Sequence, residues 1–132
     1  MLTVVAALIE SNGKILVCQR KRGDTFELMW EFPGGKLKRN ETPAQGLARE
    51  LEEELGVTSE IGEEVLRARH QYAQLSDPIE LIFLRAHITA GTPENRVFET
   101  IEWRAPETLP DLNFLPADRD LIHQLATGKL KL

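Results

Sequence analysis

The stretch WEFPGGKLKRNETPAQGLARELEEELGV, residues 30–57, constrains the fold more than any other part of the chain. It begins with strand-like alternation, and Pro33-Gly34-Gly35 is expected to end that strand because proline and glycine interrupt regular pairing. A polar loop over residues 36–41 follows, and the remainder is crowded with glutamate. The chain must therefore place a dense negative charge beside a glycine-rich turn.

The second half of this stretch carries the signals of a helix. Thr42 can cap free backbone amides, Pro43 suits the first helical position, and Gln45 has the spacing of a capping box. The helix is predicted to run to about Leu55 and to stop at Gly56, since glycine readily adopts the left-handed conformation that ends helices.

At about 100° per residue the predicted helix has two distinct faces. The apolar face, expected to point to the core, consists of Ala44, Leu47, Ala48, Leu51 and Leu55. Glu50, Glu53 and Glu54 gather on another face, where like charges repel. Mg²⁺ would relieve that repulsion, because it prefers carboxylate oxygens and often shares its coordination with substrate phosphates. The unshielded carbonyls of the glycine turn are further candidate ligands.

A solvated helix face is the alternative interpretation of this acidic cluster, with nearby basic residues as counter-charges: Lys36, Lys38 and Arg49. The spacing favours a site, because the stretch resembles the Nudix box. That pattern is Gly, five residues, Glu, seven residues, Arg-Glu, an aliphatic residue, any residue, Glu-Glu, any residue, Gly and an aliphatic residue. The matching residues here are Gly35, Glu41, Arg49, Glu50, Leu51, Glu53, Glu54, Gly56 and Val57.

The resemblance implies an α/β Nudix fold, an α/β/α sandwich with a mixed β-sheet between helices. It also implies hydrolysis of a nucleoside diphosphate linked to another moiety, with Mg²⁺ or Mn²⁺ as cofactor. The implied metal ligands are three carboxylates and one backbone carbonyl: Glu50, Glu53, Glu54 and Gly34. Glu41 and Arg49 are implied to orient the loop against the helix, which makes Glu41, Arg49, Glu50 and Glu53 the expected catalytic set.

Flanking segments resemble the MutT-type branch, which acts on oxidised purine nucleoside triphosphates, and the related CTP pyrophosphohydrolases: WEFPGGK, QRK and NFLPADRDLI. In that branch, residues at the positions of Arg20 and Lys36 contact the phosphate or sugar end of the nucleotide. Asp118 stands where MutT-type enzymes carry an asparagine that reads the base, and CTP-hydrolysing relatives carry aspartate there. The alternatives are surface charges at Arg20 and Lys36, and a helix N-terminal cap or first-turn charge at Asp118.

An ionised Asp118 only accepts hydrogen bonds and would favour the N–H edge of a guanine-like base, whereas a protonated one also donates. MutT-type enzymes carry an extra acid six residues before the late tryptophan, and this sequence has Val97 there. That departure leaves Glu99, Glu94 and Glu53 as candidate general bases. Three aromatic residues are candidates for base stacking, with core packing as the commoner role: Tyr72, Phe83 and Phe98.

Outside this stretch, β-prone runs predict strands at residues 3–9, 14–19, 64–73, 79–88 and 97–103, and a closing helix at residues 116–126. Asn12-Gly13 predicts a tight hairpin between the first two strands. A chain of 132 residues with 42% apolar residues is expected to form one domain, residues 1–132.

Charge and cysteine content narrow the expected partners. The net charge of -5 argues against a nucleic acid polymer as ligand. Cys18 is the only cysteine, so no internal disulfide forms and a reducing compartment is expected. The apolar opening is too short to span a bilayer, so we expect a cytoplasmic protein that does not bind membranes. We expect a monomer, with a dimer as the alternative.

The expected function is Mg²⁺-dependent hydrolysis of a nucleoside triphosphate to the monophosphate and pyrophosphate. Oxidised dGTP, 8-oxo-dGTP, is the favoured substrate, which would remove a mutagenic nucleotide from the pool and so protect DNA. Alternatives within this class are CTP, a methylated pyrimidine triphosphate or another damaged purine. An alternative of another class is a Nudix domain that senses a nucleotide without hydrolysing it.

Overall fold

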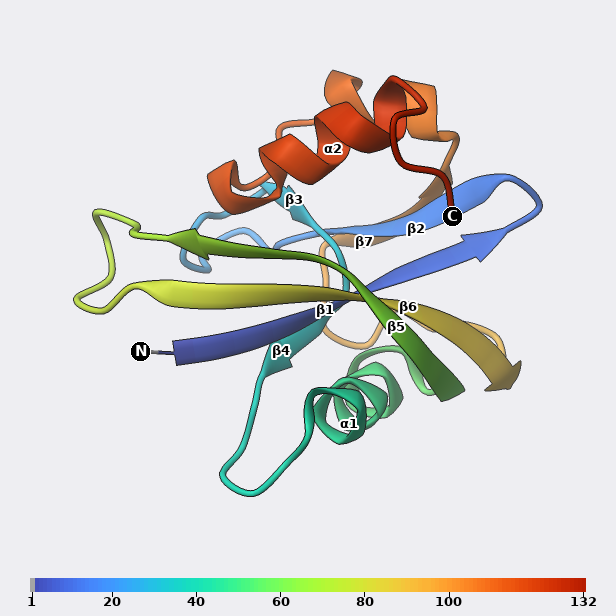
Figure 1. Ribbon diagram of the computed structural model, residues 1–132, viewed down its shortest axis with the longest axis horizontal. Coiled ribbons are helices and arrows are strands. Elements are labelled where there is room, and N and C mark those ends of the chain that lie inside the picture. Colours follow the sequence, from blue (N-terminus) through green and yellow to red (C-terminus); the bar gives the residue numbers. More distant parts are fainter. Residues whose placement is uncertain (1) are drawn as a thin grey trace.

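A computed structural model describes residues 2–132 and shows a mixed β-sheet with one α-helix on each face (Figure 1). Met1, part of the predicted domain, lies outside the described residues. The strands are β1 (Leu2–Ser11), β2 (Lys14–Gln19), β3 (Trp30–Glu31), β4 (Gly34–Lys36), β5 (Thr58–His70), β6 (Ile79–Ala90) and β7 (Thr100–Arg104). The helices are α1 (Pro43–Leu55) and α2 (Arg119–Ala126), with short 3₁₀ turns η1 (Pro106–Asp111) and η2 (Pro116–Asp118).

Strand β1 connects the two halves of the sheet. Its first part pairs with β6 in parallel and with β4 antiparallel, and β5 lies antiparallel on the far side of β6. Its end pairs with β2, which in turn pairs antiparallel with β3 and β7. The predicted hairpin is confirmed: Asn12 and Gly13 have φ angles of 53° and 77°, as a two-residue turn of this kind requires.

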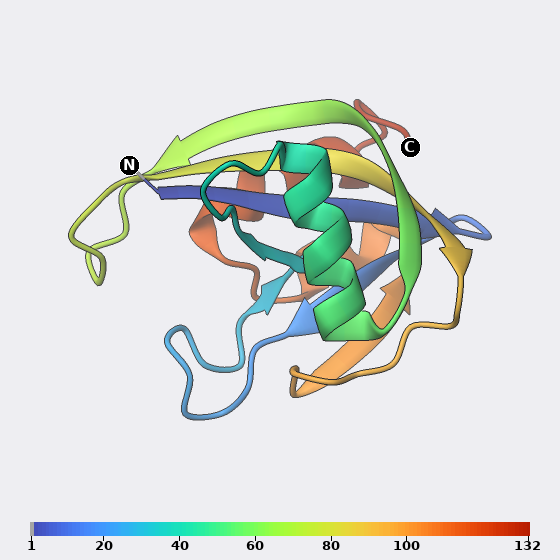
Figure 2. The ribbon, with the colours of Figure 1, turned by 90° about the horizontal axis from the view of Figure 1, so that it is seen from below.

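Helix α1 begins and ends as the sequence predicts. The Thr42 hydroxyl accepts the Gln45 backbone N–H at 3.1 Å, and the Gln45 side chain accepts the Thr42 N–H at 3.0 Å. Gly56 ends the helix with a left-handed φ of 69°. Figure 2 shows α1 crossing one face of the sheet, directly after the loop that leaves β4.

Each helix covers an apolar cluster on its own side of the sheet. Leu47, Leu51 and Leu55 of α1 pack in one cluster, and Leu121 and Leu125 of α2 pack in the other. This layering is the predicted α/β/α sandwich. Among residues 2–132, no helix is both long and apolar enough to cross a membrane.

The prediction that Ala44 faces the core is wrong, because Ala44 is exposed. Ala48, on the same predicted face, is only half-buried. The first turn of α1 faces its neighbours through Gly46 instead. A Cβ atom at Gly46 would lie 3.2 Å from a Glu41 carboxylate oxygen and would collide with Leu37. The loop before α1 therefore packs against the first turn of the helix at Gly46 rather than at Ala44.

The strand that begins at Trp30 ends before Pro33, as predicted, but the sequence did not predict that residues 34–36 form a further strand, β4. Gly34 pairs with Ala6 of β1, and a Cβ atom at Gly34 would collide with the Val5 carbonyl. Strand β4 thus depends on a pairing from a distant part of the chain, which glycine permits through close backbone approach.

Two further strand boundaries differ from the prediction. Strand β5 begins at Thr58, six residues earlier than predicted, and its pairing with β6 contains register shifts. Strand β7 begins at Thr100 rather than at residue 97. The Asn95 side chain both accepts the Phe98 N–H at 2.8 Å and donates to the Phe98 carbonyl at 2.9 Å, which folds these residues into a turn. The closing helix similarly opens as the 3₁₀ turn η2 before α2 begins.

Candidate metal and nucleotide site

Arg49 ties helix α1 to the loop that precedes it. Its guanidinium donates to both carboxylate oxygens of Glu41, at 2.7 and 3.0 Å, and to the Lys36 carbonyl at 3.1 Å. Glu41 also accepts the Lys38 backbone N–H at 2.8 Å. The hydrogen bonds from Arg49 and Lys38 lower the pKa of Glu41 to about 2. The predicted partners Glu41 and Arg49 are thus in contact, and together they fix the loop.

The acidic side chains of α1 face the turn at β4 in three different ways. Glu54 accepts the Gly34 N–H at 3.0 Å. Glu50 accepts a hydrogen bond from Arg49 at 2.8 Å, and Glu53 accepts one from the same residue at 3.3 Å with a side chain that is 55% exposed. Within residues 2–132, no three acidic, histidine or cysteine side chains already converge on one point. The two contacts with Arg49 explain this, because they draw Glu50 and Glu53 toward the guanidinium.

Among these glutamates, Glu54 is the one whose ionised form is most clearly disfavoured by burial. Burial raises its pKa to about 8, the Gly34 N–H opposes this, and the negative charges of Glu50, Glu31 and Glu53 raise it further. Gly35 leaves room beside this cluster, because a Cβ atom there would lie 2.7 Å from both carboxylate oxygens of Glu50. A group of neighbouring carboxylates with too few positive charges nearby is suited to bind a hard divalent cation.

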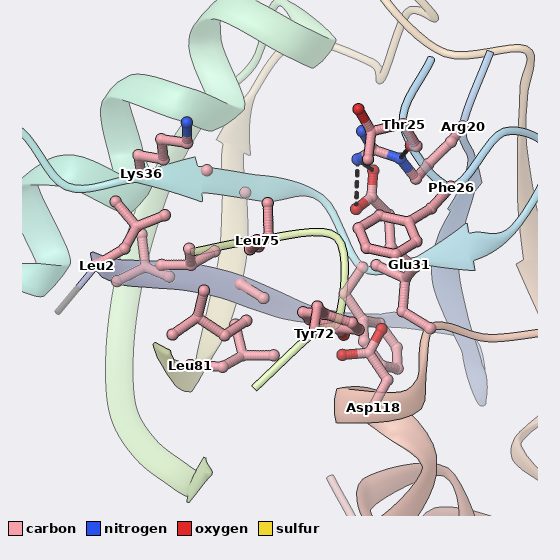
Figure 3. A pocket seen from close by; sticks show the side chains of 18 of the residues that line it. Leu2, Arg20, Thr25, Phe26, Glu31, Lys36, Tyr72, Leu75, Leu81 and Asp118 are labelled. Carbon is pink, nitrogen blue, oxygen red and sulfur yellow. Dashed lines mark hydrogen bonds and ion pairs between the residues drawn. The ribbon is translucent and has the colours of Figure 1, made fainter. Parts of the chain in front are cut away.

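A cavity of about 340 Å³ begins at these residues and extends along the sheet. Lys36 of β4 lies at one end, and Arg20 and Asp118 are among the residues at the other (Figure 3). Gly35 of the same strand and Glu54, which accepts the Gly34 N–H, also line the cavity. Apolar side chains from the sheet and the loop after β5 also line the cavity: Leu2, Val4, Leu75, Ile79 and Leu81. The cavity therefore joins an acidic, metal-compatible end to a distinct polar end.

Asp118 is 3% exposed, and its Oδ2 atom is buried with no hydrogen-bond partner among the described residues. It occupies the N-cap position of α2 and the first turn of η2, but its side chain makes no capping hydrogen bond. Burial, followed by the negative charge of Glu31, raises the pKa of Asp118 well above its usual value. Its carboxyl group is therefore available to a ligand in the cavity.

Arg20 lies at the same end of the cavity as Asp118 (Figure 3). It donates to both carboxylate oxygens of Glu31 at 3.1 Å and to the Thr25 carbonyl at 2.7 Å. Glu31 and Phe26 also line this end, although no local sequence pattern marks either residue. Adjacent strands bring Glu31 beside Arg20, since β2 and β3 pair Gln19 with Trp30.

The structure places the remaining candidates for base stacking and for the general base differently: some line the cavity and others do not. Tyr72 lines the cavity, whereas Phe83 and Phe98 are buried in the two apolar clusters on opposite faces of the sheet. Glu99 is exposed, accepts the Arg22 N–H at 3.3 Å and does not line the cavity. The Glu94 backbone N–H donates to the Leu55 carbonyl at 2.9 Å, which places this residue at the end of α1.

Comparisons with known proteins show which family the chain resembles. The NUDIX domain family model matches residues 1–125. The chain is 38% identical over 122 residues to the CTP pyrophosphohydrolase of Escherichia coli K12, with 92% of this chain and 89% of the relative covered. It is 36% identical over 126 residues to the 8-oxo-dGTP diphosphatase of Haemophilus influenzae, with 95% and 91% covered. The crystal structure of a MutT NUDIX hydrolase from Burkholderia pseudomallei aligns with a TM-score of 0.82 at 28% identity, covering 93% of this chain and 96% of that one.

Proposed function

The chain belongs to the NUDIX family, and from this premise we propose that it hydrolyses nucleoside triphosphates to the monophosphate and pyrophosphate in a divalent metal-dependent reaction. The favoured substrate in this proposal is 8-oxo-dGTP, so that the enzyme sanitises the nucleotide pool. One observation carries it: a single cavity connects the acidic residues beside Gly34 with the unpartnered carboxyl group of Asp118. A triphosphate is long enough to engage both ends.

The residues that would hold Mg²⁺, or Mn²⁺, are Glu50, Glu53, Glu54 and the Gly34 carbonyl. The cation supplies charge neutralisation for the phosphate oxygens and lowers the pKa of a bound water. Arg49 contacts both Glu50 and Glu53 and so provides a positive charge beside two of the proposed ligands. Glu53 is the proposed proton acceptor because its side chain is the more exposed of these two. Glu99 is the second candidate for that role.

The polar end of the cavity is proposed to determine which base the substrate carries. Arg20 and Lys36 are proposed to contact the sugar and phosphate groups, and Asp118 is proposed to read the base. A preference for CTP or a methylated pyrimidine triphosphate is the second candidate, because the CTP pyrophosphohydrolase relative is 38% identical to this chain. Aspartate accepts hydrogen bonds when ionised and also donates when protonated, so either class of base offers it partners.

The wider setting of this proposal is a cytoplasmic enzyme in which residues 1–132 act as one domain. The proposed ligand is a free nucleotide rather than a nucleic acid polymer, since acidic residues outnumber basic ones by 21 to 16. A monomer contains every residue of the proposed site, so dimer formation is not required for activity.

The test is a panel of triphosphates with Mg²⁺ assayed by pyrophosphate release, with 8-oxo-dGTP, dGTP and CTP compared by kcat/KM. Replacing the proposed proton acceptor, Glu53→Gln, should reduce kcat by about 10²–10⁴-fold. Glu52→Gln is the matched control, because Glu52 lies on the same helix with an exposed side chain. It should retain activity within about twofold, as expected for a solvated surface residue.

Failure to release pyrophosphate from any triphosphate would overturn the hydrolase proposal. Tight nucleotide binding without turnover would instead support the sensor alternative. Equal losses in Glu53→Gln and Glu52→Gln would remove Glu53 from the chemistry, and a comparable loss in Glu99→Gln would make that residue the better candidate for the general base.

A further inference from the structure

Tyr72 links three separate segments at the polar end of the cavity. Its ring lies 4.8 Å from that of Phe26, at an angle of 52°, and 4.3 Å from that of His70 at the end of β5. Its hydroxyl oxygen accepts the backbone N–H of Ala117 at 3.1 Å in a buried hydrogen bond. Tyr72 therefore contacts the β2–β3 loop, the end of β5 and the turn η2.

The β2–β3 loop holds Phe26 against Tyr72 in an unfavourable backbone conformation. Phe26 and Leu28 have φ angles of 59° and 61°, which bulky side chains rarely adopt. The loop is held by bonds at its base, where the Arg20 side chain donates to Thr25 and Gln19 donates to the Leu28 carbonyl. Such strain persists only where surrounding contacts overdetermine it, and it often accompanies a functional role.

The opposite side of this end is formed by the turn η2. Ala117 directly precedes Asp118, so the bond from Ala117 to the Tyr72 hydroxyl fixes the backbone beside the buried carboxyl group. The Oδ2 atom of Asp118 has no hydrogen-bond partner of its own among the described residues. The position of this carboxyl group is therefore set through the turn. Figure 3 shows Phe26, Tyr72 and Asp118 together at one end of the cavity.

We propose that Tyr72 is a positioning residue that sets base selectivity, because its ring holds Phe26 and its hydroxyl holds the turn that carries Asp118. This inference rests on the proposed function, in which Asp118 reads the base. A carboxyl group discriminates between bases only when its position is fixed relative to them, and small displacements weaken that discrimination. Tyr72 acts on selectivity without taking part in the chemistry at the acidic end.

The test compares the dissociation constants of 8-oxo-dGMP and CMP, measured by calorimetry without turnover. Tyr72→Phe keeps the ring but leaves the buried Ala117 N–H without its partner. The ratio of the two constants should move toward one by roughly 5–20-fold, the range expected for one unsatisfied buried donor. For the wild-type enzyme's best substrate, kcat should stay within about threefold, because the altered contact is remote from the acidic end.

Thr108→Val is the matched control, because it also removes a hydroxyl group that holds a 3₁₀ turn. The half-buried Thr108 hydroxyl donates to the Ala105 carbonyl at 2.7 Å. It lies outside the cavity and should leave the ratio unchanged. A double-mutant cycle with Asp118→Asn then separates positioning from a general structural role. Once Asp118 is replaced, Tyr72→Phe should change the ratio by less than about twofold, since residues acting through one another are not additive.

An unchanged ratio in Tyr72→Phe, or effects that simply add in the cycle, would overturn the role of Tyr72 while leaving the hydrolase proposal intact. Absence of pyrophosphate release with a ratio that still shifts would overturn the hydrolase and retain Tyr72 as a selectivity residue for binding. If neither mononucleotide binds, the role of Tyr72 in base selectivity fails, whereas pyrophosphate release alone decides the hydrolase proposal. Should Tyr72→Phe not fold, Phe26→Leu removes the ring contact alone and must also move the ratio toward one.

Discussion

Glu54 shows how a single residue can work against the stability of the metal-free protein. Its carboxyl group has a folded-state pKa of about 8 against an ordinary value of 4.5, chiefly because of burial. Below pH 4.5 the group is protonated in both states. As pH rises from 4.5 to 8, the unfolded chain loses this proton while the folded one keeps it. The free energy of unfolding therefore falls with pH across this window.

Replacing this carboxyl group should consequently stabilise the protein in the presence of a chelator. Glu54→Gln keeps an oxygen that can accept the Gly34 N–H and removes the buried charge. We expect the free energy of unfolding at pH 8.5 to rise by about 1–2 kcal/mol, with no change at pH 4, measured by urea denaturation. Glu52→Gln, with its exposed side chain, should show no such difference between the two pH values. A loss of stability in Glu54→Gln at pH 8.5 would contradict this account.

At the scale of the element, the junction of β4 and α1 places a glycine where the helix presents a carboxylate. An alanine Cβ at residue 35 would lie 2.7 Å from both Glu50 oxygens, so the side chain of Glu50 must move. Gly35→Ala should weaken Mg²⁺ binding and reduce kcat/KM by roughly tenfold or more, since misplaced catalytic groups are costly. Isothermal titration with Mg²⁺ and the pyrophosphate assay measure the two effects.

Gly62→Ala is the matched control for that substitution. Gly62 lies within β5, where an added Cβ would be 3.4 Å from the Arg85 Cβ, which is close to ordinary contact. Any general effect of glycine replacement on strand stability should appear in both variants. If Gly62→Ala loses as much Mg²⁺ affinity as Gly35→Ala, the close approach to Glu50 does not matter.

Elements whose signals are local were the ones that the sequence predicted well. Helix α1 carries its own caps at Thr42 and Gly56, and the Asn12-Gly13 turn needs only its own residues. Strand β4 was missed because its pairing comes from β1, about thirty residues earlier, and glycine-rich triplets do not show strand propensity. The start of β7 was missed because side-chain bonds of Asn95, rather than propensity, decide where the turn ends.

The candidate site divides in the same way. The acidic end comes from one continuous stretch, so its resemblance to the Nudix box could be recognised, and that resemblance implied the observed contact of Glu41 with Arg49. The polar end is assembled from β2, β3, the loop after β5 and η2, and the residues named for base or nucleotide binding in advance were Asp118, Arg20 and, as a stacking candidate, Tyr72. Burial of Asp118 without a partner is a property of the tertiary structure, which no local pattern contains.

At the scale of the whole molecule, the cavity is lined by residues from Leu2 to Asp118, and therefore by both halves of the sheet and the turn before α2. A ligand that binds only the folded chain stabilises all of these elements together. At a concentration one hundred times its dissociation constant, such a ligand contributes about 2.7 kcal/mol. For a domain of this size, that corresponds to a rise in Tm of about 6–10 °C.

The two ends of the cavity should contribute to this stabilisation independently, because different side chains are proposed to hold the metal and the base. In differential scanning fluorimetry, Mg²⁺ alone and 8-oxo-dGMP with Mg²⁺ should each raise the Tm of the wild-type protein. Asp118→Ala should keep the rise caused by Mg²⁺ and lose most of the additional rise caused by the nucleotide. Glu54→Gln should lose most of the rise caused by Mg²⁺, since it lacks one proposed ligand at the opposite end. If each variant loses both responses equally, the acidic and polar ends act as one inseparable unit, and the division of roles along the cavity is wrong.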